Sequence, residues 1–344
     1  MTIRLIEGFE NFGPSGTTGL TLQTAISKRY VCDTTYSTDA ILVDGWGSGV
    51  GLKWPATSGT EYLQMVLMPG DRSITIGFAL KTPIFSGMQY SRILFDTYYA
   101  QAQFQHFDFG LSVNGYLLIT NYAGTDIWIS NTALRSDQWV YIEIKAWLDT
   151  TASGTIEIRI NGVVDSTYTG ISAYLTNIAS IVNWYGASAD CILDDIYIAT
   201  SSDGLDGYYG PARVETLHPS DDAGLNDWTP SSAVDHYTLV NTIPVNTSNY
   251  LVGETGSELF EYPNTSLDTI KAVKISSEVL TDATSISQIN QICVNGANTY
   301  DGDIFNIIST DPFEVQDIFE LNPETANSWE PSELNASQFG IERL

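Results

Sequence analysis

The sequence predicts an all-β protein made of two β-sandwich domains. Tyr and Trp are abundant, with 19 and 8 residues, while charged side chains make up only 16% of the chain, a composition that favours pleated sheets. Apolar and polar residues alternate with a period of two in many short runs, and no stretch keeps helical spacing over several turns. With 344 residues, the chain exceeds what one hydrophobic core usually holds.

The individual strands follow from this alternation. It predicts strands at 73–80, 107–113, 116–122, 139–148 and 155–160 in the first half, and at 270–280, 285–294 and 303–309 in the second. Asn-Gly pairs beginning at Asn114, Asn161 and Asn295 each follow Val or Ile. Such pairs are typical of type I′ hairpins, in which both central residues take positive φ, so we expect antiparallel sheets. Near the C-terminus, Pro331 predicts a short helix before a last strand.

A Gly- and Asp-rich segment, SSDGLDGYYGP at 201–211, marks the domain boundary. We place the two domains at 1–205 and 206–344. The net charge of −27 is uneven: the first domain has 10 basic and 19 acidic side chains, a balance of −9, and the second has 4 and 22, a balance of −18. Because a surface of this sign repels nucleic acid and anionic membranes, we expect neither nucleic-acid binding nor membrane insertion.

Cysteine content and the N-terminal sequence indicate the compartment of synthesis. Cys32, Cys191 and Cys293 are odd in number and lack metal-ligand spacing, so they are interpreted as small buried apolar residues. The N-terminal sequence has no apolar stretch long enough for a signal peptide, and no run of the chain is apolar enough to span a bilayer. We therefore expect a protein made as a soluble cytosolic chain.

Four segments in the first 200 residues occur in a recognisable order. They are RLIEGFENF (4–12), SITIGFALKT (73–82), the paired strands of 137–164 with their Asn-Gly turn, and ILDDIYI (192–198). Together they resemble the concanavalin A-like, laminin-G-like jelly roll, in which a strand that begins with Trp, a hairpin and a closing Asp-Asp strand recur. The resemblance implies a lectin-like sandwich over 1–205.

Three further segments are similar to the C-terminal half of tailed-phage virion proteins that begin with this lectin-like domain. They are GPARVETLHPSDDAGLNDWTP (210–230), NTYDGD (298–303) and ANSWEPSELNASQFGIERL (326–344). This resemblance implies a second β-sandwich and a virion structural protein that is not an enzyme, most simply a tail-associated fibre, tip or adaptor with an adhesion module. Capsid decoration or a head fibre is the alternative, and a free carbohydrate-binding protein a more distant one.

The same resemblance indicates the partners. On the virion surface we expect contacts with other virion proteins and homo-oligomerisation, since such particles assemble by symmetry. A host surface glycan is a candidate ligand.

Two adjacent carboxylates, Asp194 and Asp195, interrupt the apolar run 191–200. In a regular strand they face opposite sides of the sheet, so they cannot act together as a catalytic pair. One of them must then be satisfied beside apolar groups, and we expect Asp194 to accept hydrogen bonds from a neighbouring loop or from the N-terminal strand. The alternative is a calcium site at Asp194 and Asp195, as laminin-G-like domains sometimes have.

Other catalytic arrangements find little support in the sequence. Glu143 and Glu157 lie on alternating strands that also carry Lys145 and Arg159, so we expect all four side chains to face water. The three histidines are scattered, and neither a metal-binding pattern nor a G-x-S-x-G elbow is found. No catalytic residues are assigned.

Aromatic side chains in or near loops are the better candidates for ligand binding, because amphipathic rings stack on sugars or anchor protein interfaces. The candidates are Trp46, Trp54, Tyr98, Tyr99, Trp184 and Tyr185. The alternative is that most of these rings fill the two cores. Trp139 and Trp329 are assigned to the cores.

Overall fold

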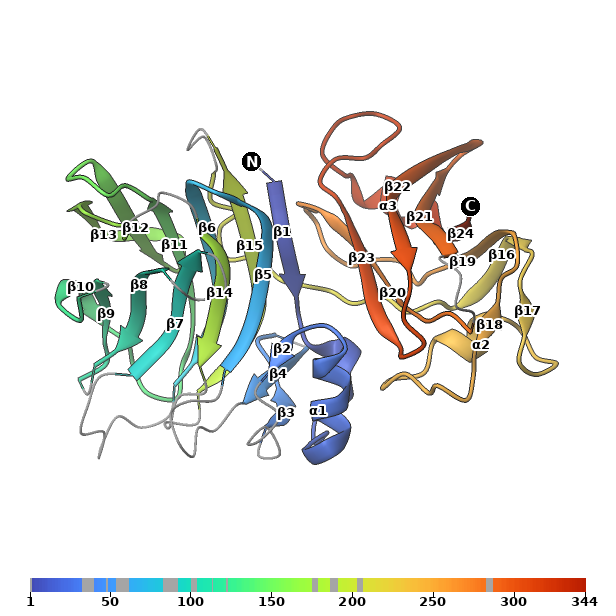
Figure 1. The fold of residues 1–344 in the computed structure, drawn as a ribbon, viewed down its shortest axis with the longest axis horizontal. Helices are drawn as coiled ribbons and strands as arrows, with labels where there is room; N and C mark the ends of the chain where they lie inside the picture. Colours follow the sequence, from blue (N-terminus) through green and yellow to red (C-terminus); the bar gives the residue numbers. More distant parts are fainter. Residues whose placement is uncertain are drawn as a thin grey trace. The chain divides into compact units, whose positions relative to one another are not determined.

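A computed structural model describes residues 2–32, 40–47, 49–53, 62–82, 92–99, 104–112, 114–121, 123–174, 179–185, 191–202, 207–282 and 287–344. The chain forms two compact units, Met1–Val214 and Glu215–Leu344, each built mainly from antiparallel strands (Figure 1). The predicted all-β class with two sandwiches is confirmed.

Two sheets make up the first unit. One contains, in order, β13 (Val163–Gly170), β12 (Gly154–Ile160), β11 (Trp139–Trp147), β6 (Ser73–Lys81), β15 (Ile192–Ser201), β4 (Val50–Lys53) and β3 (Ile41–Asp44), and β1 (Thr2–Glu7) also pairs with β15. The other contains β10 (Asp126–Ala133), β9 (Tyr116–Asn121), β8 (Phe104–Leu111), β7 (Arg92–Tyr99), β14 (Ala179–Tyr185), β5 (Tyr62–Asp71) and β2 (Val31–Cys32).

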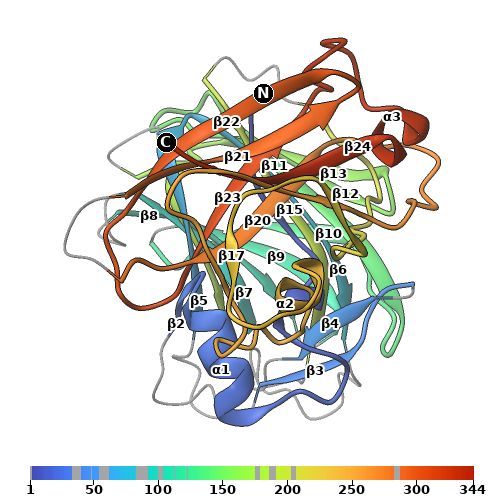
Figure 2. The same cartoon turned by 90° about the vertical axis from the view of Figure 1, so that its right-hand side faces the viewer.

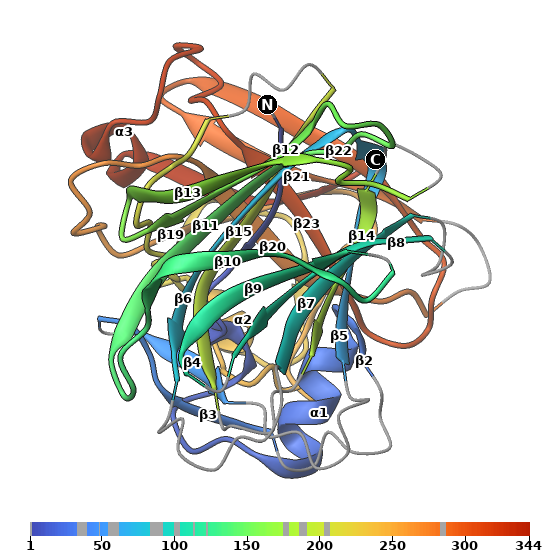
Figure 3. The same ribbon diagram turned by 90° about the vertical axis from the view of Figure 1, so that its left-hand side faces the viewer.

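The core of the first unit lies between these sheets, which face each other in Figure 3. Alternate residues of β6, β11 and β12 point inward from one sheet, and those of β8 and β9 from the other. Phe78 and Phe109 meet edge to face across the gap, with ring centroids 6.1 Å apart. A short 3-10 turn (Glu10–Phe12) and α1 (Gly19–Ser27) add Phe12, Leu22 and Ile26 to the same core.

The hairpin turns agree with the sequence in part. Asn161 and Gly162 both have positive φ, 51° and 79°, as the type I′ prediction requires. At the other two pairs only the glycine has positive φ, 82° at Gly115 and 62° at Gly296. In the second unit, Asn295 pairs with Asn298 across the ladder, so the turn is centred one residue later than predicted.

Gly77 on β6 is required by close packing on the outer face of its sheet. A Cβ at this position would lie 2.1 Å from Cε1 of the Tyr197 ring. The Tyr197 hydroxyl donates to Glu143 at 2.7 Å, and its ring packs edge to face on Tyr209, so the ring has little room to move.

We therefore expect Gly77→Ala to lower the free energy of unfolding of the first unit by about 1–3 kcal/mol, a typical effect of overpacking. Urea denaturation measures it. The matched control is Gly207→Ala, because a Cβ at Gly207 would meet no atom within 4 Å. Equal stability of the two variants would contradict the packing argument.

The second unit is a smaller sandwich (Figure 2). Its larger sheet runs β16 (Asp221–Asn226), β19 (Gly256–Glu261), β24 (Ser337–Arg343), β21 (Ser287–Asn295) and β22 (Asn298–Ile307). The pair β20 (Val273–Val279) and β23 (Phe313–Phe319) forms the other layer. Between the layers, Ile275 of β20 packs with Cys293 and Phe339, and Val315 of β23 packs with Ile289 and Ile341. A small pair, β17 (Thr229–Pro230) and β18 (Leu251–Val252), and the short helix α2 (Tyr237–Val240) complete it.

The predicted C-terminal helix is confirmed as α3 (Pro331–Asn335), which has a proline in its first turn and a reciprocal capping box between Glu330 and Glu333. Trp329 is buried in the core of the second unit, as predicted. Trp139 is only half-buried, because it sits at the start of β11, so its assignment to the core was wrong.

The unit boundary follows Val214, nine residues later than the composition predicted. Residues 207–214 are held against the first sandwich by hydrogen bonds from Gly210 N and Val214 N. Among the described residues, no helix is long and apolar enough to cross a membrane.

Candidate functional site

The closing strand β15 contains a bulge at the acidic pair. Asp194 pairs with Ala79 of β6, and Tyr197 pairs with Gly77. Two residues of β15 therefore lie opposite one residue of β6, and Asp195 takes a positive φ of 48°. As a result, Leu193, Ile196 and Ile198 all enter the core. The regular alternation predicted from sequence is wrong here. Asp194 and Asp195 both lie outside the core cluster although both are buried.

Asp194 is satisfied by backbone N–H groups, as predicted. Its Oδ2 accepts from Trp46 N at 2.6 Å, and its Oδ1 accepts from Asp195 N at 2.8 Å. Trp46 belongs to the glycine-rich loop between β3 and β4, where a Cβ at Gly45 would collide with Asp194 Oδ2. The loop thus follows the carboxylate closely, which explains its glycine content.

Asp195 holds the segment that leaves the first unit. Its Oδ1 accepts from Val214 N at 2.7 Å. Its Oδ2 is buried and has no hydrogen-bond partner. The Arg213 guanidinium lies against Gly47, at 2.8 Å from a Cβ placed there, and its charge partly offsets that of Asp195.

Glu143 on β11 holds the same segment further along. It is fully buried, and its Oε1 accepts from Gly210 N at 2.8 Å and from the Tyr197 hydroxyl at 2.7 Å. The expectation that Glu143 faces water is therefore wrong, because residues 208–214 cover this part of the outer face of the sheet. Glu157 is half-exposed and pairs with Arg159 at 2.9 Å, in line with its predicted solvated character.

Burial dominates the electrostatics of this group of carboxylates. Desolvation, together with the neighbouring charge of Asp195, raises the pKa of Asp194 to about 8. Desolvation raises the pKa of Asp195 to about 7, with the hydrogen bond from Val214 N opposing the shift. The pKa values of Tyr141 and Tyr197 are raised for the same reason, and the charge of Glu143 adds to both shifts.

Glu7 and Arg29 form a buried ion pair beside this group. Arg29 Nη1 lies 2.6 Å from Glu7 Oε2, and the two side chains are only 4% and 1% exposed. Glu7 also accepts from Phe9 N and from the Tyr30 hydroxyl, at 2.8 and 2.6 Å. The carboxylate is thus fully used in joining β1 to the segment around α1.

The donor set at Asp194 and Asp195 does not suit calcium. Calcium takes six to eight oxygen ligands, whereas three of the four carboxylate oxygens here accept N–H donors. Within the described part of the chain, no three His, Cys, Asp or Glu side chains are grouped to hold a metal ion. The pair serves to join a loop, a strand and the departing segment.

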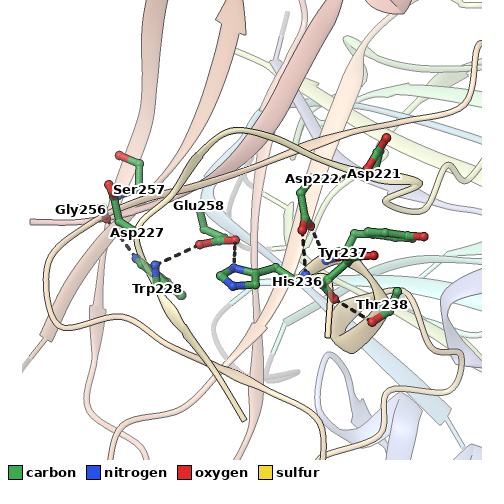
Figure 4. Close-up of polar contacts among 11 residues, drawn as sticks. Asp221, Asp222, Asp227, Trp228, His236, Tyr237, Thr238, Gly256, Ser257 and Glu258 are labelled. Carbon is green, nitrogen blue, oxygen red and sulfur yellow. Dashed lines mark hydrogen bonds and ion pairs between the residues drawn. The ribbon is translucent and has the colours of Figure 1, made fainter. Parts of the chain in front are cut away.

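A second polar site lies in the smaller unit, around His236 and Glu258 (Figure 4). Nδ1 of His236 is 2.6 Å from Oε1 of Glu258, whose side chain is fully buried on β19. Oε2 of Glu258 accepts from Trp228 N at 3.2 Å. With the Asn226 amide in its flipped orientation, which satisfies both of its polar atoms, its nitrogen donates to Oε1 at 3.3 Å. Burial raises the pKa of Glu258, while the hydrogen bond from His236 opposes that shift.

The backbone around His236 is fixed by one aspartate. Both carboxylate oxygens of Asp222 accept N–H groups at the start of α2, from His236 at 2.9 Å and from Tyr237 at 2.6 Å (Figure 4). The imidazole is thus held in place through both its backbone and its Nδ1 atom. A histidine oriented in this way by a carboxylate is chemically able to accept or donate a proton at Nε2.

The predicted binding aromatics are only partly described. The Trp46 ring is half-buried and packs on Tyr141, with the ring centroids 5.2 Å apart. Trp54 lies outside the described residues. Tyr98 and Tyr99 lie on β7, and Trp184 and Tyr185 on β14, which are neighbouring strands of one sheet. Their role in binding stays a prediction.

Sequence reasoning missed Glu143, Tyr197 and the His236–Glu258 pair. The signal for Glu143 was weak, because the segment that covers it, 208–214, lies beyond the domain boundary that the sequence predicts. His236 and Glu258 are 22 residues apart, and only the fold brings them together.

Comparisons with known proteins assign the chain to no family. No family model matches the chain, and no curated protein matches it by sequence. Among solved structures, alginate lyase Aly36B matches with a TM-score of 0.41 and 6% identity, over 58% of this chain and 97% of that one. An endo-β-1,4-glucuronan lyase from Trichoderma reesei gives a TM-score of 0.34 and 8% identity, over 58% and 91%. A heptameric pentraxin from Limulus polyphemus gives 0.32 and 14%, over 42% and 73%.

These comparisons correct one prediction from the sequence. The chain was expected not to be an enzyme, but alginate lyases and a glucuronan lyase are among the structures that resemble it. That expectation is contradicted and is not retained.

Proposed function

We propose that the protein is a structural component of a tailed-phage particle, located on the virion surface and most simply tail-associated, with the first unit as a lectin-like adhesion or interaction module. Other virion proteins and further copies of the chain are its partners, and a host surface glycan is a candidate ligand. Capsid decoration is the alternative location.

One observation carries this proposal. The segments that resemble phage virion proteins contain the residues on which the second unit depends. Asp222 fixes the start of α2. Trp228 donates from its backbone N to Glu258 and from Nε1 to Gly256 O, the latter at 3.1 Å. Trp329 donates from the core to Phe319 O at 3.0 Å. Because these roles belong to the folding of the unit, the resemblance supports a shared fold over the whole second half, in addition to the lectin-like first half.

The test is to purify particles of the phage that encodes the chain and to locate the protein on them. We expect it among the proteins of gradient-purified particles, with immunogold label on the tail. Label confined to the head would replace the tail assignment by capsid decoration. Absence from particles, with the protein recovered in the soluble fraction of the lysate, would overturn the proposal in favour of a free carbohydrate-binding protein.

Catalytic activity is a separate question with a separate assay. Incubation with alginate or glucuronan, followed by detection of unsaturated sugar ends, measures lyase turnover directly. Turnover would add an activity to the proposed location without contradicting it.

A further inference from the structure

The segment Tyr208–Val214 is attached to the first sandwich in an unusual way. Pro211 and Arg213 are exposed, while Ala212 and Val214 are half-buried, the alternation of an extended chain lying on a surface. Its described hydrogen bonds to the sheet run through side chains, and no backbone ladder is described for it. We call Tyr208–Val214 the strap.

Attachment points occur along the whole strap. Val214 N donates to Asp195, the backbone of Ala212 hydrogen-bonds Tyr141, and Gly210 N donates to Glu143. At its start, Tyr209 N donates to the Tyr197 hydroxyl at 3.4 Å, and the Tyr208 ring lies under the Arg159 guanidinium at 3.7 Å. Two of the acceptors, Asp195 and Glu143, each have a second buried oxygen without a partner.

We propose that the strap provides additional linker length. It detaches from the first sandwich, without unfolding it, when the chain is pulled from its C-terminal side. The strap is the last segment of the first unit, so tension from that side reaches Val214 first. The bonds of Val214, Ala212, Gly210 and Tyr209 are then loaded one after another.

Sequential loading separates the strap from the strands behind it. Bonds that are loaded one at a time break at a lower force than bonds that share the load. The strand β15, in contrast, pairs along its length with β6 and with β1, so many of its bonds must break together. The two oxygens without partners are also rehydrated when the strap leaves, which lowers the cost of opening. Local opening below the global free energy of unfolding is the expected behaviour of such a segment.

The gain in length follows from the geometry of the chain. Seven residues, Tyr208 to Val214, span at most about 24 Å when fully extended. Peeling therefore lengthens the connection to the second unit by up to this amount, while the core and the sheets stay folded. The inference concerns the first unit alone and holds whatever the location of the protein.

Hydrogen exchange of the full chain tests the strap directly. We expect the amides of Gly210 and Val214 to be protected, but to open with a lower free energy than amides of β6 and β11. The proposal is overturned if these two amides exchange only with the global unfolding of the sandwich, and equally if they show no protection at all.

A matched pair of variants isolates the anchor at Glu143. Glu143→Gln keeps an oxygen for Gly210 N and the Tyr197 hydroxyl, whereas Glu143→Ala removes it. We expect exchange at Gly210 to rise tenfold or more in Glu143→Ala and to stay within twofold of wild type in Glu143→Gln, with β6 and β11 unchanged in both. Equal exchange at Gly210 in the two variants contradicts the anchor. If Glu143→Ala does not fold, the wild-type comparison above still decides.

Pulling on single molecules from the two ends of the chain gives the mechanical readout. We expect a low-force extension of up to about 24 Å before either unit unfolds. A first event no smaller than the unfolding of a whole unit would overturn the proposal.

Discussion

Raising the pH from 5 to 9 lowers the stability of the first unit. The pKa of Asp194 is about 8 and that of Asp195 about 7 in the fold, against about 3.9 in an unfolded chain. Between pH 4 and pH 8 the folded state therefore binds more protons than the unfolded state, so stability decreases as pH rises through this window. A shift of three units corresponds to about 4 kcal/mol, so the effect is large. Thermal unfolding at pH 5, 7 and 9 measures it.

Asp195→Asn is the variant that separates this effect from general charge repulsion. Asparagine keeps an oxygen for Val214 N, cannot ionise, and is among the residues that tolerate the positive φ of Asp195. We expect the variant to be more stable than wild type at pH 9 and to show a flatter pH profile. Asp137→Asn is the control, because Asp137 also has positive φ, at 58°, but is 76% exposed. The same flattening in the control would refute the assignment to the buried pair.

Removing the imidazole at position 236 destabilises the second unit strongly. Glu258 is fully buried, and Nδ1 of His236 lies 2.6 Å from its Oε1. Taking out one partner of a buried hydrogen bond leaves the other polar group unsatisfied, which costs about 1–3 kcal/mol. We expect His236→Ala to lower the free energy of unfolding of the second unit by this amount in urea denaturation.

A double-mutant cycle shows whether the pair is the cause. Glu258→Gln keeps an oxygen for Trp228 N and removes the charge. The double variant should therefore be clearly less destabilised than the sum of the two single variants, by about 1–2 kcal/mol. His218→Ala serves as the control, because His218 is also half-buried but has no described hydrogen bond to a carboxylate. Strict additivity in the cycle would mean that the two side chains do not interact.

Local pattern was sufficient for the class of fold and for many of its strands. The alternation at 139–148 and 155–160 predicted β11 and β12 to within a residue or two, because one face of each strand is apolar throughout. The Asn161–Gly162 turn was predictable for the same reason, since its backbone conformation is a local property of the two residues.

The candidate sites depend on contacts between segments that are far apart in the sequence. The local alternation of apolar and polar residues does not predict such contacts. The alternation at 192–198 gave no sign of the bulge at Asp195, which is imposed by the pairing of β15 with β6. Glu143 looked solvated because its cover, the strap, lies 67 residues further along the chain. The pattern of charged residues alone does not distinguish a solvent-exposed face of a sheet from a face that a later segment of the chain covers.

The pairing of β1 with β15 bears on how the first unit can be used. Thr2, at the start of the first strand, lies opposite Thr200, near the end of the last one. The first and last strands of this sandwich are therefore neighbours, and the chain then returns along β15, because Val214, where the unit ends, is bonded to Asp195 near the start of that strand. Tension applied at Val214 and at the N-terminus thus enters the sandwich at opposite ends of β1.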